Sequence, residues 1–525
     1  MSSSQRTIVD ALRRAVADHG DRTAVDDGAR RLTFRELGAG VREVAAAFVA
    51  AGVQRGDVVS IWAPNSLEWI QAFLGLEHAG ATIAPINTRF KGREAAEILR
   101  RSRAKVLVTV DRFLDVDYVD MLRATGVELP DLTTIVVVGQ APSGSIRWED
   151  FLARADDAAR AEAEVRAAAV TGDDVSDILF TSGTTGVPKG VVQTHASTMC
   201  VGDDWIDLAG LRAGDVYLMV NPYFHMFGLK AGILASVAAG ATMLPEPVFD
   251  ISRVLKRVQE EKVTVLPGAP TIYQAMLDAP DRASYDLSSL RAAVTGAADI
   301  PVELIRRIFA ELPFTRVAAG YGLTEAGTAA GSGPDDDETM IATTVGRARP
   351  TFELRLVDAD GNEVAPGETG EVTLRGGSIM RGYLDDPEAT RAVLSEDGWL
   401  RTGDLGVIGA DGCLRIVGRV KDMFIVGGFN AYPAEIENAL LRHDAVQQVA
   451  VIGIPDDRLG EVGMAFVVLQ PGAAVTEDEL IAWSREEMAN YKVPRRVAFL
   501  AALPFNATGK VVKDELRALA ASPSA

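Results

Sequence analysis

Hydrophobic positions recur along the chain with two spacings, which predict helices alternating with strands. At the N-terminus, Ile8, Val9, Leu12 and Val16 share one face of a 3.6-residue repeat, so an amphipathic helix is predicted over residues 7–17. Short unbroken apolar runs follow at 106–110, 134–138, 177–180, 216–220, 263–266, 292–295 and 317–319. Such runs, separated by helical stretches, are typical of strands buried on both faces. The pattern predicts an α/β fold.

After about residue 350 the pattern changes to alternation of apolar and polar residues. Residues 352–357 and 371–374 alternate in this way around an Asp-Gly turn at 360–361, which predicts antiparallel strands and hairpins. Asp386-Pro387 predicts the start of a short helix. A main boundary is expected near 418–421, followed by a small α+β domain. There we predict a helix over 433–441, strands at 449–454 and 465–469, and a capping box of Thr476 with Glu479 before a further helix.

Composition and charge limit the classes of partner. The 525 residues contain 53 basic and 73 acidic side chains, so the formal net charge is 53 − 73 = −20. This balance argues against nucleic acid or an anionic membrane as the main partner, but permits a small anionic ligand. Cys200 and Cys413 form neither a disulfide framework nor a zinc site. Without a secretion signal or an apolar run of about 20 residues, the chain is expected to be soluble and cytoplasmic.

One segment has the composition of a phosphate-binding loop. Residues 181–190 read Thr-Ser-Gly-Thr-Thr-Gly-Val-Pro-Lys-Gly directly after a predicted strand. Glycines let backbone N–H groups approach phosphate oxygens, hydroxyls add donors, and Lys189 adds charge. Pro188 stands where a Walker A loop has glycine, so this is not that motif. The alternative is a flexible turn, which rarely carries so many phosphate donors.

Three further segments are expected where strands end, which is where open α/β sheets bind ligands. Residues 295–298 read Thr-Gly-Ala-Ala and 320–325 read Gly-Tyr-Gly-Leu-Thr-Glu. Small residues leave room for a flat ring on which Tyr321 could stack, and Glu325 could hold Mg²⁺. In the third segment, 399–404, Asp404 could accept hydrogen bonds from both ribose hydroxyls. Alone, Glu325 would be read as a surface carboxylate and Asp404 as a turn residue.

Together these segments resemble the acyl-adenylate-forming superfamily of acyl-CoA synthetases, adenylation domains and luciferases. The resemblance covers nearly the whole chain and rests on seven segments in order: 181–190, 222–228, 321–325, 401–404, 418–422, 427–433 and 509–510. It implies a large N-terminal domain of stacked sheets flanked by helices, with a β-rich subdomain, joined by a hinge to a small α+β domain. The implied bounds are 1–418 for the ATP- and acyl-binding domain, 419–422 for the hinge and 423–525 for the lid.

The resemblance also implies an AMP-forming ligase that uses ATP, Mg²⁺ and CoA. A carboxylate attacks the α-phosphate of ATP, and a thiol then displaces AMP from the acyl-adenylate. The implied catalytic residues are Lys510, Thr184, Glu325 and His225, with Glu325 and Thr184 at the metal. The implied nucleotide-binding residues are Thr181, Ser182, Gly183, Thr185, Gly186, Lys189, Gly296, Ala297, Ala298, Gly320, Tyr321, Gly322, Thr324, Asp404 and Arg419.

The two half-reactions require different surroundings. In the family's pattern the small domain rotates about the position of Lys421, which removes Lys510 from the site, and Gly427 and Gly428 then line the thiol tunnel. His225 is expected to be an aromatic wall between the acyl and nucleotide sites. It is not a general base in this mechanism, because a carboxylate is already ionised at neutral pH. Read alone, a histidine among aromatic residues is more often a core residue.

The expected acyl pocket is apolar. Its predicted walls are Trp205, Met226, Phe227, Leu229, Ala319, Gly327 and Ala330. None of these is charged, so a polar substrate would leave its groups unpaired, and a bulky hydrophobic acid is expected. Residues 421–437 and 456–463 resemble actinobacterial CoA ligases for steroid-derived or polycyclic acids. A medium-chain fatty acid or an aryl acid is the alternative.

Two other functions are considered. A stand-alone adenylation enzyme would load a carrier protein in place of CoA, although no carrier motif follows Lys510 within this sequence. A non-catalytic nucleotide-binding module would predict the loss of Lys510, Glu325 or Asp404, and all three are present. The sequence does not fix the oligomeric state, and a homodimer is an open alternative.

Overall fold

The computed structural model describes residues 6–181, 188–296, 302–427, 429–505 and 511–521. Two compact units are recognised from the contacts within the chain. Unit 1 comprises Met1–Ala342, Gly346–Glu353 and Leu374–Leu400, and unit 2 comprises Thr343–Val345, Leu354–Thr373 and Arg401–Ala525. No helix within the described ranges is long and apolar enough to cross a membrane.

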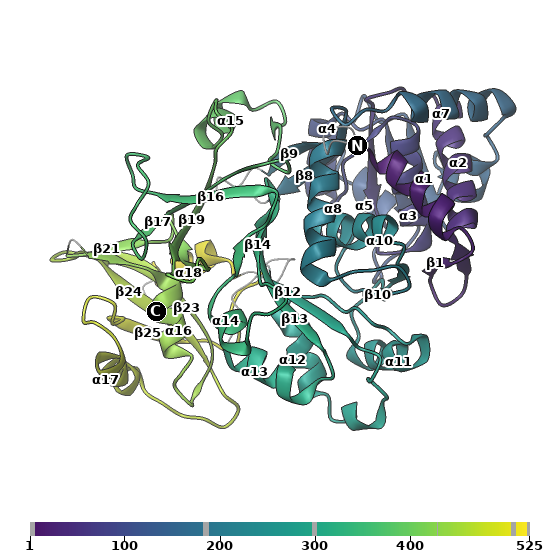
Figure 1. The fold of residues 1–525 in the computed structure, drawn as a ribbon. Helices are drawn as coiled ribbons and strands as arrows, with labels where there is room; N and C mark the ends of the chain where they lie inside the picture. Colours follow the sequence, from purple (N-terminus) through teal and green to yellow (C-terminus); the bar gives the residue numbers. More distant parts are fainter. Residues whose placement is uncertain (1–5, 182–187, 297–301, 428, 506–510, 522–525) are drawn as a thin grey trace. The chain divides into compact units, whose positions relative to one another are not determined.

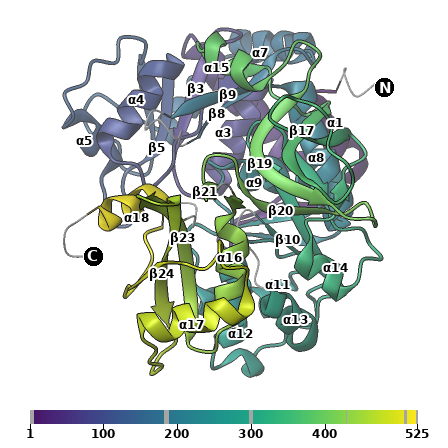
Figure 2. The ribbon, with the colours of Figure 1, turned by 90° about the vertical axis from the view of Figure 1, so that its left-hand side faces the viewer.

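The largest sheet of unit 1 has eight strands in the order β18-β9-β8-β4-β3-β5-β6-β7 (Figures 1 and 2). Its strands are β3 (Val58–Trp62), β4 (Thr82–Ile83), β5 (Val106–Val110), β6 (Thr134–Val138), β7 (Ile146–Arg147), β8 (Val175–Thr181), β9 (Lys189–Thr194) and β18 (Gly382–Tyr383). The strands from β8 to β7 pair in parallel, whereas β9 and β18 are antiparallel additions at one edge. The predicted strands at 106–110 and 134–138 are confirmed, and that at 177–180 lies within β8.

Two more sheets complete unit 1. One has the order β10-β11-β1-β2 and the other β12-β13-β14-β15. Their strands are β1 (Thr23–Asp26), β2 (Arg31–Thr33), β10 (Val216–Met219), β11 (Thr242–Pro245), β12 (Ala292–Gly296), β13 (Arg316–Leu323), β14 (Gly327–Gly331) and β15 (Arg347–Ala348). The prediction of a full strand over residues 263–266 is wrong, because Val265 makes only isolated β-bridges, to Tyr217 and Ala292. Pro267 follows at once and has no backbone N–H to extend a ladder.

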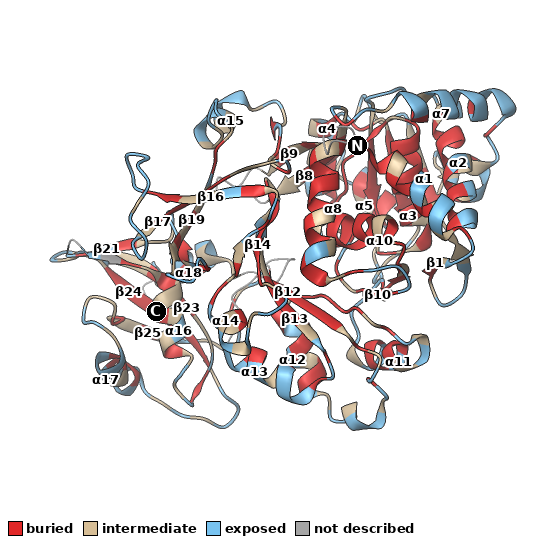
Figure 3. Ribbon diagram, in the orientation of Figure 1, coloured by how far each residue is buried: buried red, intermediate tan, exposed pale blue. Residues whose placement is uncertain are grey.

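Unit 1 also contains helices, most of which have a buried face and an exposed face (Figure 3). They are α1 (Ile8–His19), α2 (Phe34–Ala50), α3 (Leu67–His78), α4 (Gly92–Ser102), α5 (Tyr118–Arg123), α6 (Trp148–Leu152), α7 (Asp157–Ala169), α8 (His195–Ala209), α9 (Met226–Gly228), α10 (Ala235–Ala239), α11 (Ile251–Glu261), α12 (Pro270–Asp278), α13 (Val302–Glu311), α14 (Glu338–Thr343) and α15 (Pro387–Val393). A π-helix, η2 (Leu229–Leu234), and a 3₁₀-helix, η3 (Arg282–Ser284), interrupt the series. The Asp386 side chain accepts from the amide of Ala389, as expected for the start of α15.

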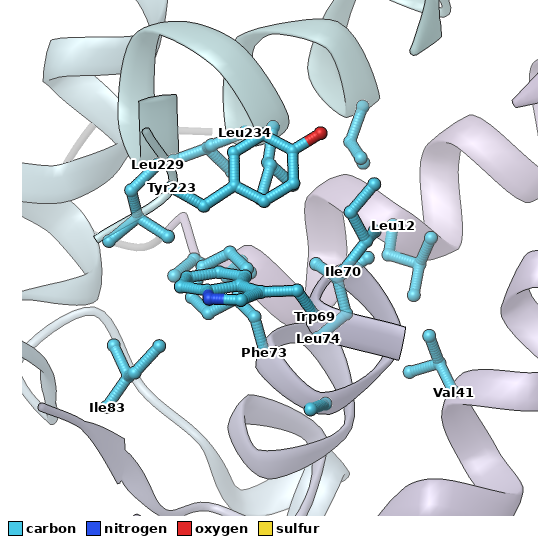
Figure 4. Packing of buried hydrophobic residues seen from close by; sticks show 14 of the residues in the cluster. Leu12, Val41, Trp69, Ile70, Phe73, Leu74, Ile83, Tyr223, Leu229 and Leu234 are labelled. Carbon is cyan, nitrogen blue, oxygen red and sulfur yellow. The ribbon is translucent and has the colours of Figure 1, made fainter. Parts of the chain in front are cut away.

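The main core of unit 1 fixes the segment that follows His225. Trp69 of α3 meets the ring of Tyr223 edge-on at 5.3 Å between centroids, and Leu229 packs beside them (Figure 4). Leu229 is almost completely buried. The start of η2 is therefore held by the core.

Unit 2 contains two antiparallel-rich sheets. The first has the order β16-β17-β19-β20, with β16 (Phe352–Val357), β17 (Thr369–Gly376), β19 (Leu400–Ile408) and β20 (Leu414–Arg419). The second has the order β22-β21-β24-β23, with β25 beside β24. Its strands are β21 (Phe424–Val426), β22 (Phe429–Ala431), β23 (Val446–Asp456), β24 (Gly460–Leu469) and β25 (Arg496–Phe499), and its helices are α16 (Pro433–Leu440), α17 (Glu477–Glu487) and α18 (Lys513–Ala520).

The sequence predictions for this region largely agree with the structure. The capping box is present: the Thr476 hydroxyl accepts from the amide of Glu479, and the Glu479 carboxylate accepts from the amide of Thr476. The helix that follows is α17, and Met488 is its C-cap. The division into units groups residues 343–345, 354–373 and 401–422 with residues 423–525. The hinge at 419–422 stays a prediction.

Candidate active site

A β-hairpin frames the predicted phosphate loop. Strands β8 and β9 are antiparallel, and their last pair is Thr181 with Lys189. Lys189 therefore begins a strand. The guanidinium of Arg101, from α4, donates to the carbonyl of Pro188 and lies 5.6 Å from the ring centroid of Phe180. The hairpin thus presents Lys189, and α4 adds Arg101, which was not predicted from the sequence, at Pro188. Ser182, Gly183, Thr184, Thr185 and Gly186 lie outside the described residues.

Tyr383 joins two predicted site residues that are far apart in sequence. The ammonium of Lys189 lies 4.8 Å from the centroid of its ring, and its hydroxyl donates to Glu325 Oε1 at 3.0 Å. Burial, followed by the nearby charge of Glu325, raises the pKa of Tyr383, so the phenol remains a donor. One aromatic side chain thus contacts both a cation and a carboxylate of the predicted site. The sequence analysis missed Tyr383, whose Arg-Gly-Tyr-Leu context shows no metal or phosphate chemistry.

Backbone hydrogen bonds fix this arrangement. Strand β18 pairs with β9, with Tyr383 opposite Val191, and the amide of Leu384 donates to the carbonyl of Gly190 at 2.7 Å. The amide of Met380 donates to the carbonyl of Glu325, also at 2.7 Å. Main-chain bonds therefore hold the Glu325 segment and the hairpin strand β9 to the same short stretch of chain.

The predicted adenine segments meet at the ends of β12 and β13. Gly296 pairs with Gly320 in this parallel ladder, and a Cβ on Gly296 would lie 2.5 Å from the carbonyl oxygen of Gly320. The prediction that residues 320–325 follow a strand is wrong for 320–323. These four residues are the end of β13, where they pair with β14. Tyr321 lies opposite Ala330. Thr324 follows the strand, while Ala297 and Ala298 lie outside the described ranges.

Glycines in these strands permit close approach of the backbone. A Cβ on Gly322 would lie 2.2 Å from the carbonyl oxygen of Gly327, and one on Gly327 would lie 2.5 Å from Val201 Cγ2 of α8. Gly327 also has φ +81°, a conformation that favours glycine. Ala319 and Ala330 are fully buried. The small residues therefore let α8 and the β13–β14 hairpin pack closely, and their role in an acyl pocket stays a prediction.

The remaining acyl-pocket candidates surround His225. The Nδ1 atom of His225 accepts from the amide of Phe227 at 3.2 Å, which places the proton of the neutral ring on Nε2. The rings of Trp205 and Phe227 meet edge-on at 5.0 Å. Met226 is partly exposed beside them, whereas Leu229 belongs to the core. The structure thus brings the rings of Trp205 and Phe227 into contact within unit 1 and ties His225 to the backbone of Phe227; these three residues are called the aromatic group.

The predicted ribose residues lie together within unit 2. Asp404 of β19 is opposite Arg419 of β20, and Arg419 Nε donates to Asp404 Oδ1 at 2.7 Å. Asp404 is 6% exposed and Arg419 is exposed, so the pair has a buried acceptor and an accessible donor. Antiparallel pairing therefore juxtaposes two residues that lie fifteen positions apart.

The predicted hinge and tunnel residues lie in turns of unit 2. Lys421 is exposed in the turn that leads from β20 to β21. Gly427 has φ +57° and donates its amide to the carbonyl of Leu459 at 2.8 Å. Gly428 and Lys510 lie outside the described residues.

The described residues fit a nucleotide with Mg²⁺. No group of three or more His, Cys, Asp or Glu side chains in the described ranges could hold a metal alone. Mg²⁺ at a phosphate usually needs only one or two carboxylates, with phosphate oxygens and water completing its shell. Glu325, held by Tyr383 beside Lys189, would supply that carboxylate, and Lys189 would supply charge for the phosphates.

Comparisons with known proteins identify the family of this chain. The AMP-binding enzyme family matches residues 12–384, and the AMP-binding enzyme C-terminal domain matches residues 435–510. A (7a-methyl-1,5-dioxo-octahydro-1H-inden-4-yl)propanoyl:CoA ligase of Rhodococcus jostii is 48% identical over 98% of this chain and 99% of its own length. A ligase of the same name from Mycobacterium tuberculosis is 48% identical over 99% of this chain and 100% of its own length.

A solved structure of an anthranilate CoA ligase in complex with anthranoyl-AMP is also similar. It has a TM-score of 0.88 and 31% identity, and the match covers 99% of each chain. The resemblance inferred from the motifs is therefore confirmed. The chain belongs to the AMP-binding enzymes, as a member of the AMP-forming acyl-CoA ligases.

Proposed function

We propose that this ligase joins a bulky, hydrophobic, polycyclic carboxylic acid to CoA at the expense of ATP. The observation that supports the site most directly is the contact of Tyr383 with both Lys189 and Glu325. Tyr383 thereby holds the proposed phosphate-binding cation, Lys189, near the proposed metal-binding carboxylate, Glu325. Both groups are needed where two anions, a carboxylate and a triphosphate, must react.

The first half-reaction forms a bond between a carboxylate oxygen of the acid and the α-phosphorus of ATP, and breaks the bond to pyrophosphate. Mg²⁺, when bound at Glu325, would neutralise phosphate charge. Lys189 and the loop 182–187 would bind the β- and γ-phosphates, and Lys510 would bridge the attacking carboxylate and the α-phosphate. Tyr321, Gly296 and Gly320 would line the adenine slot. Asp404 and Arg419 would bind the ribose.

The second half-reaction forms a bond between the sulfur of CoA and the acyl carbon, and AMP leaves. Rotation about Lys421 would remove Lys510 from the site, and Gly427 with Gly428 would line the path of the thiol. Glycines suit such a path because they add no side chain to a narrow channel. A reaction that draws on ATP and CoA is proposed to occur in the cytoplasm.

Two features favour a polycyclic acid as substrate. The aromatic group formed by His225, Trp205 and Phe227 offers apolar surface without a charged side chain among its members. Two relatives at 48% identity are named as CoA ligases for a propanoyl group attached to a methyl-dioxo-octahydroindenyl ring system. Apolar walls disfavour a charged substrate because its polar groups would lose their hydrogen bonds to water.

The proposal is tested by pyrophosphate release from ATP with a panel of acids, each with and without CoA. The panel comprises acetate, octanoate, 4-coumarate and 3-(7a-methyl-1,5-dioxo-octahydroinden-4-yl)propanoate. The indenyl acid should give the highest kcat/KM, and acyl-CoA should form only when CoA is present. Lys510→Ala serves as the inactive control. Adenylate without thioester would indicate a carrier protein as acceptor, and preference for octanoate or 4-coumarate would refute the polycyclic substrate.

A further inference from the structure

Lys230 is a buried lysine to which the chemistry above gives no role. It lies in the π-helix η2, five residues after His225, and none of its surface is exposed. π-helical turns are rare and are found mainly at functional sites. A buried ammonium is costly unless it is paired and hydrogen-bonded. Its partners therefore indicate what the lysine does.

The ammonium of Lys230 has two partners in the sheet that carries the phosphate loop. Its Nζ lies 2.8 Å from Asp177 Oδ1 of β8 and donates to Gln193 Oε1 of β9. Asp177 Oδ2 accepts from the hydroxyls of Ser176, at 2.7 Å, and Thr198, at 2.6 Å. Asp177 and Gln193 are themselves paired across the two strands. The ion pair thus ties η2 to both arms of the hairpin.

Other ionisable groups lie near this pair. Burial, and then the charge of Asp177, raises the pKa of Glu77 well above its usual value, whereas the charge of Lys230 lowers it. His195 Nε2 lies 3.3 Å from Glu77 Oε2, and burial lowers the pKa of His195 to about 4, so this ring is neutral at pH 7. Burial lowers the pKa of Lys230, and the charge of Asp177, 2.8 Å away, opposes that shift. Asp177 is therefore the carboxylate in direct contact with Lys230.

Lys230 and two backbone carbonyls together fix the amide of Gln193. An ammonium only donates, so the amide oxygen faces it and the amide nitrogen faces away. That nitrogen donates to the carbonyl oxygens of Ser378, at 3.0 Å, and Thr324, at 3.3 Å. Without the lysine, the amide oxygen would lose the donor that anchors its end of the side chain. Gln193 is itself fully buried, so water could not replace the lost bonds.

The two carbonyls flank the predicted metal-binding group. Thr324 directly precedes Glu325, and Ser378 lies in the short stretch that continues to Met380 and Tyr383, both of which bond to Glu325. The amide of Gln193 therefore holds together the two segments that position the Glu325 carboxylate. Protein stability alone does not explain the buried Lys230–Asp177 ion pair, because two apolar side chains of similar volume often stabilise a protein as well.

We propose that Lys230 is a positioning residue for the nucleotide site, acting through Gln193 on the segment Thr324–Glu325. This inference rests on the proposed function, since it assumes that Glu325 serves Mg²⁺ and ATP. The lysine itself touches no substrate in this scheme. It fixes the amide of Gln193, and the amide fixes the carboxylate.

Two variants test the network without leaving an unpaired charge. Lys230→Met combined with Asp177→Asn removes the ion pair as a unit, and Gln193→Met removes the amide while the ion pair remains. The matched control is Arg257→Met combined with Glu246→Gln, which removes another buried pair, at 3.2 Å, outside the network. The measured quantities are the Kd of α,β-methylene-ATP by calorimetry, the Mg²⁺ concentration at half-saturation, and the KM of the indenyl acid.

Both network variants should raise the Kd and the Mg²⁺ requirement at least fivefold, while the KM of the acid stays within twofold. The control should bind the analogue within twofold of wild type. A folded network variant with wild-type Kd overturns the proposal, and so does an equal loss in the control, which would indicate general destabilisation. If Lys230→Met with Asp177→Asn fails to fold, Gln193→Met still decides. Wild-type protein that does not bind the analogue would refute the proposed function itself.

Discussion

Tyr383→Phe tests whether the tyrosine positions the metal-binding carboxylate. The substitution removes the hydroxyl that donates to Glu325 at 3.0 Å and keeps the ring that lies 4.8 Å from the ammonium of Lys189. It therefore separates the carboxylate contact from the cation contact. Phenylalanine has nearly the same shape, so packing around the half-buried ring should be preserved.

The magnitude follows from the type of hydrogen bond. A bond to a charged acceptor contributes roughly 1.5–3 kcal/mol, and the partial exposure of Tyr383 favours the lower end. About 1.5 kcal/mol corresponds to roughly tenfold in an equilibrium constant. We therefore expect the Mg²⁺ concentration at half-saturation to rise about tenfold in Tyr383→Phe. Tyr383→Leu should add a further loss in ATP affinity, since a cation–π contact contributes about 0.5–1 kcal/mol.

The assay is pyrophosphate release at saturating acid, with Mg²⁺ varied at fixed ATP and then ATP varied at fixed Mg²⁺. Tyr118→Phe is the control, because its hydroxyl donates to the carbonyl of Thr88, at 2.6 Å, and contacts no predicted site residue. If Tyr383→Phe shows the Mg²⁺ dependence of wild type, or if Tyr118→Phe shifts it as much, the positioning role of Tyr383 is refuted.

Three further predictions concern the mechanism and stability. Lys510→Ala should lower the rate of adenylate formation by at least about a hundredfold and leave thioester formation from supplied acyl-adenylate unchanged. Separate assays of the two half-reactions measure this, and equal losses in both would refute rotation of the lid. Gly327→Ala should lower the free energy of unfolding, measured by urea titration, by about 2–4 kcal/mol, because Gly327 has φ +81° and the new Cβ would lie 2.5 Å from Val201 Cγ2. The control is Gly361→Ala, where φ is +87° but nothing lies within 4 Å of the new Cβ, and it should lower the free energy of unfolding by about 1 kcal/mol. Burial, and then two nearby arginine charges, lowers the pKa of His78 to about 4, so its native ring is neutral and stability falls as pH drops from about 6.5 to 4. In His78→Gln this fall should be shallower by about 1.4 kcal/mol per pH unit in urea titrations across that range, and an unchanged slope would contradict the assignment.

Local patterns in the sequence determined many elements and most of the chemistry. The strands at 106–110, 134–138 and 352–357 have the predicted bounds, because an unbroken or alternating apolar run needs only its neighbours to specify extended backbone. The capping box at Thr476 likewise depends on residues three positions apart. The motifs were sufficient for the family, and the comparisons confirmed it.

Tertiary structure alone decided how these parts come together. Strand β14 consists of small residues without an apolar period, so no local pattern indicated that β13 continues through Tyr321 to pair with it. Tyr383 reaches Lys189 and Glu325 because a two-residue strand docks on β9, a contact between segments nearly 200 positions apart. Lys230 stands in no recognisable local motif, and only the tertiary structure places its ammonium 2.8 Å from Asp177 Oδ1. Such contacts depend on the packing of distant segments, which local periodicity and propensity do not encode.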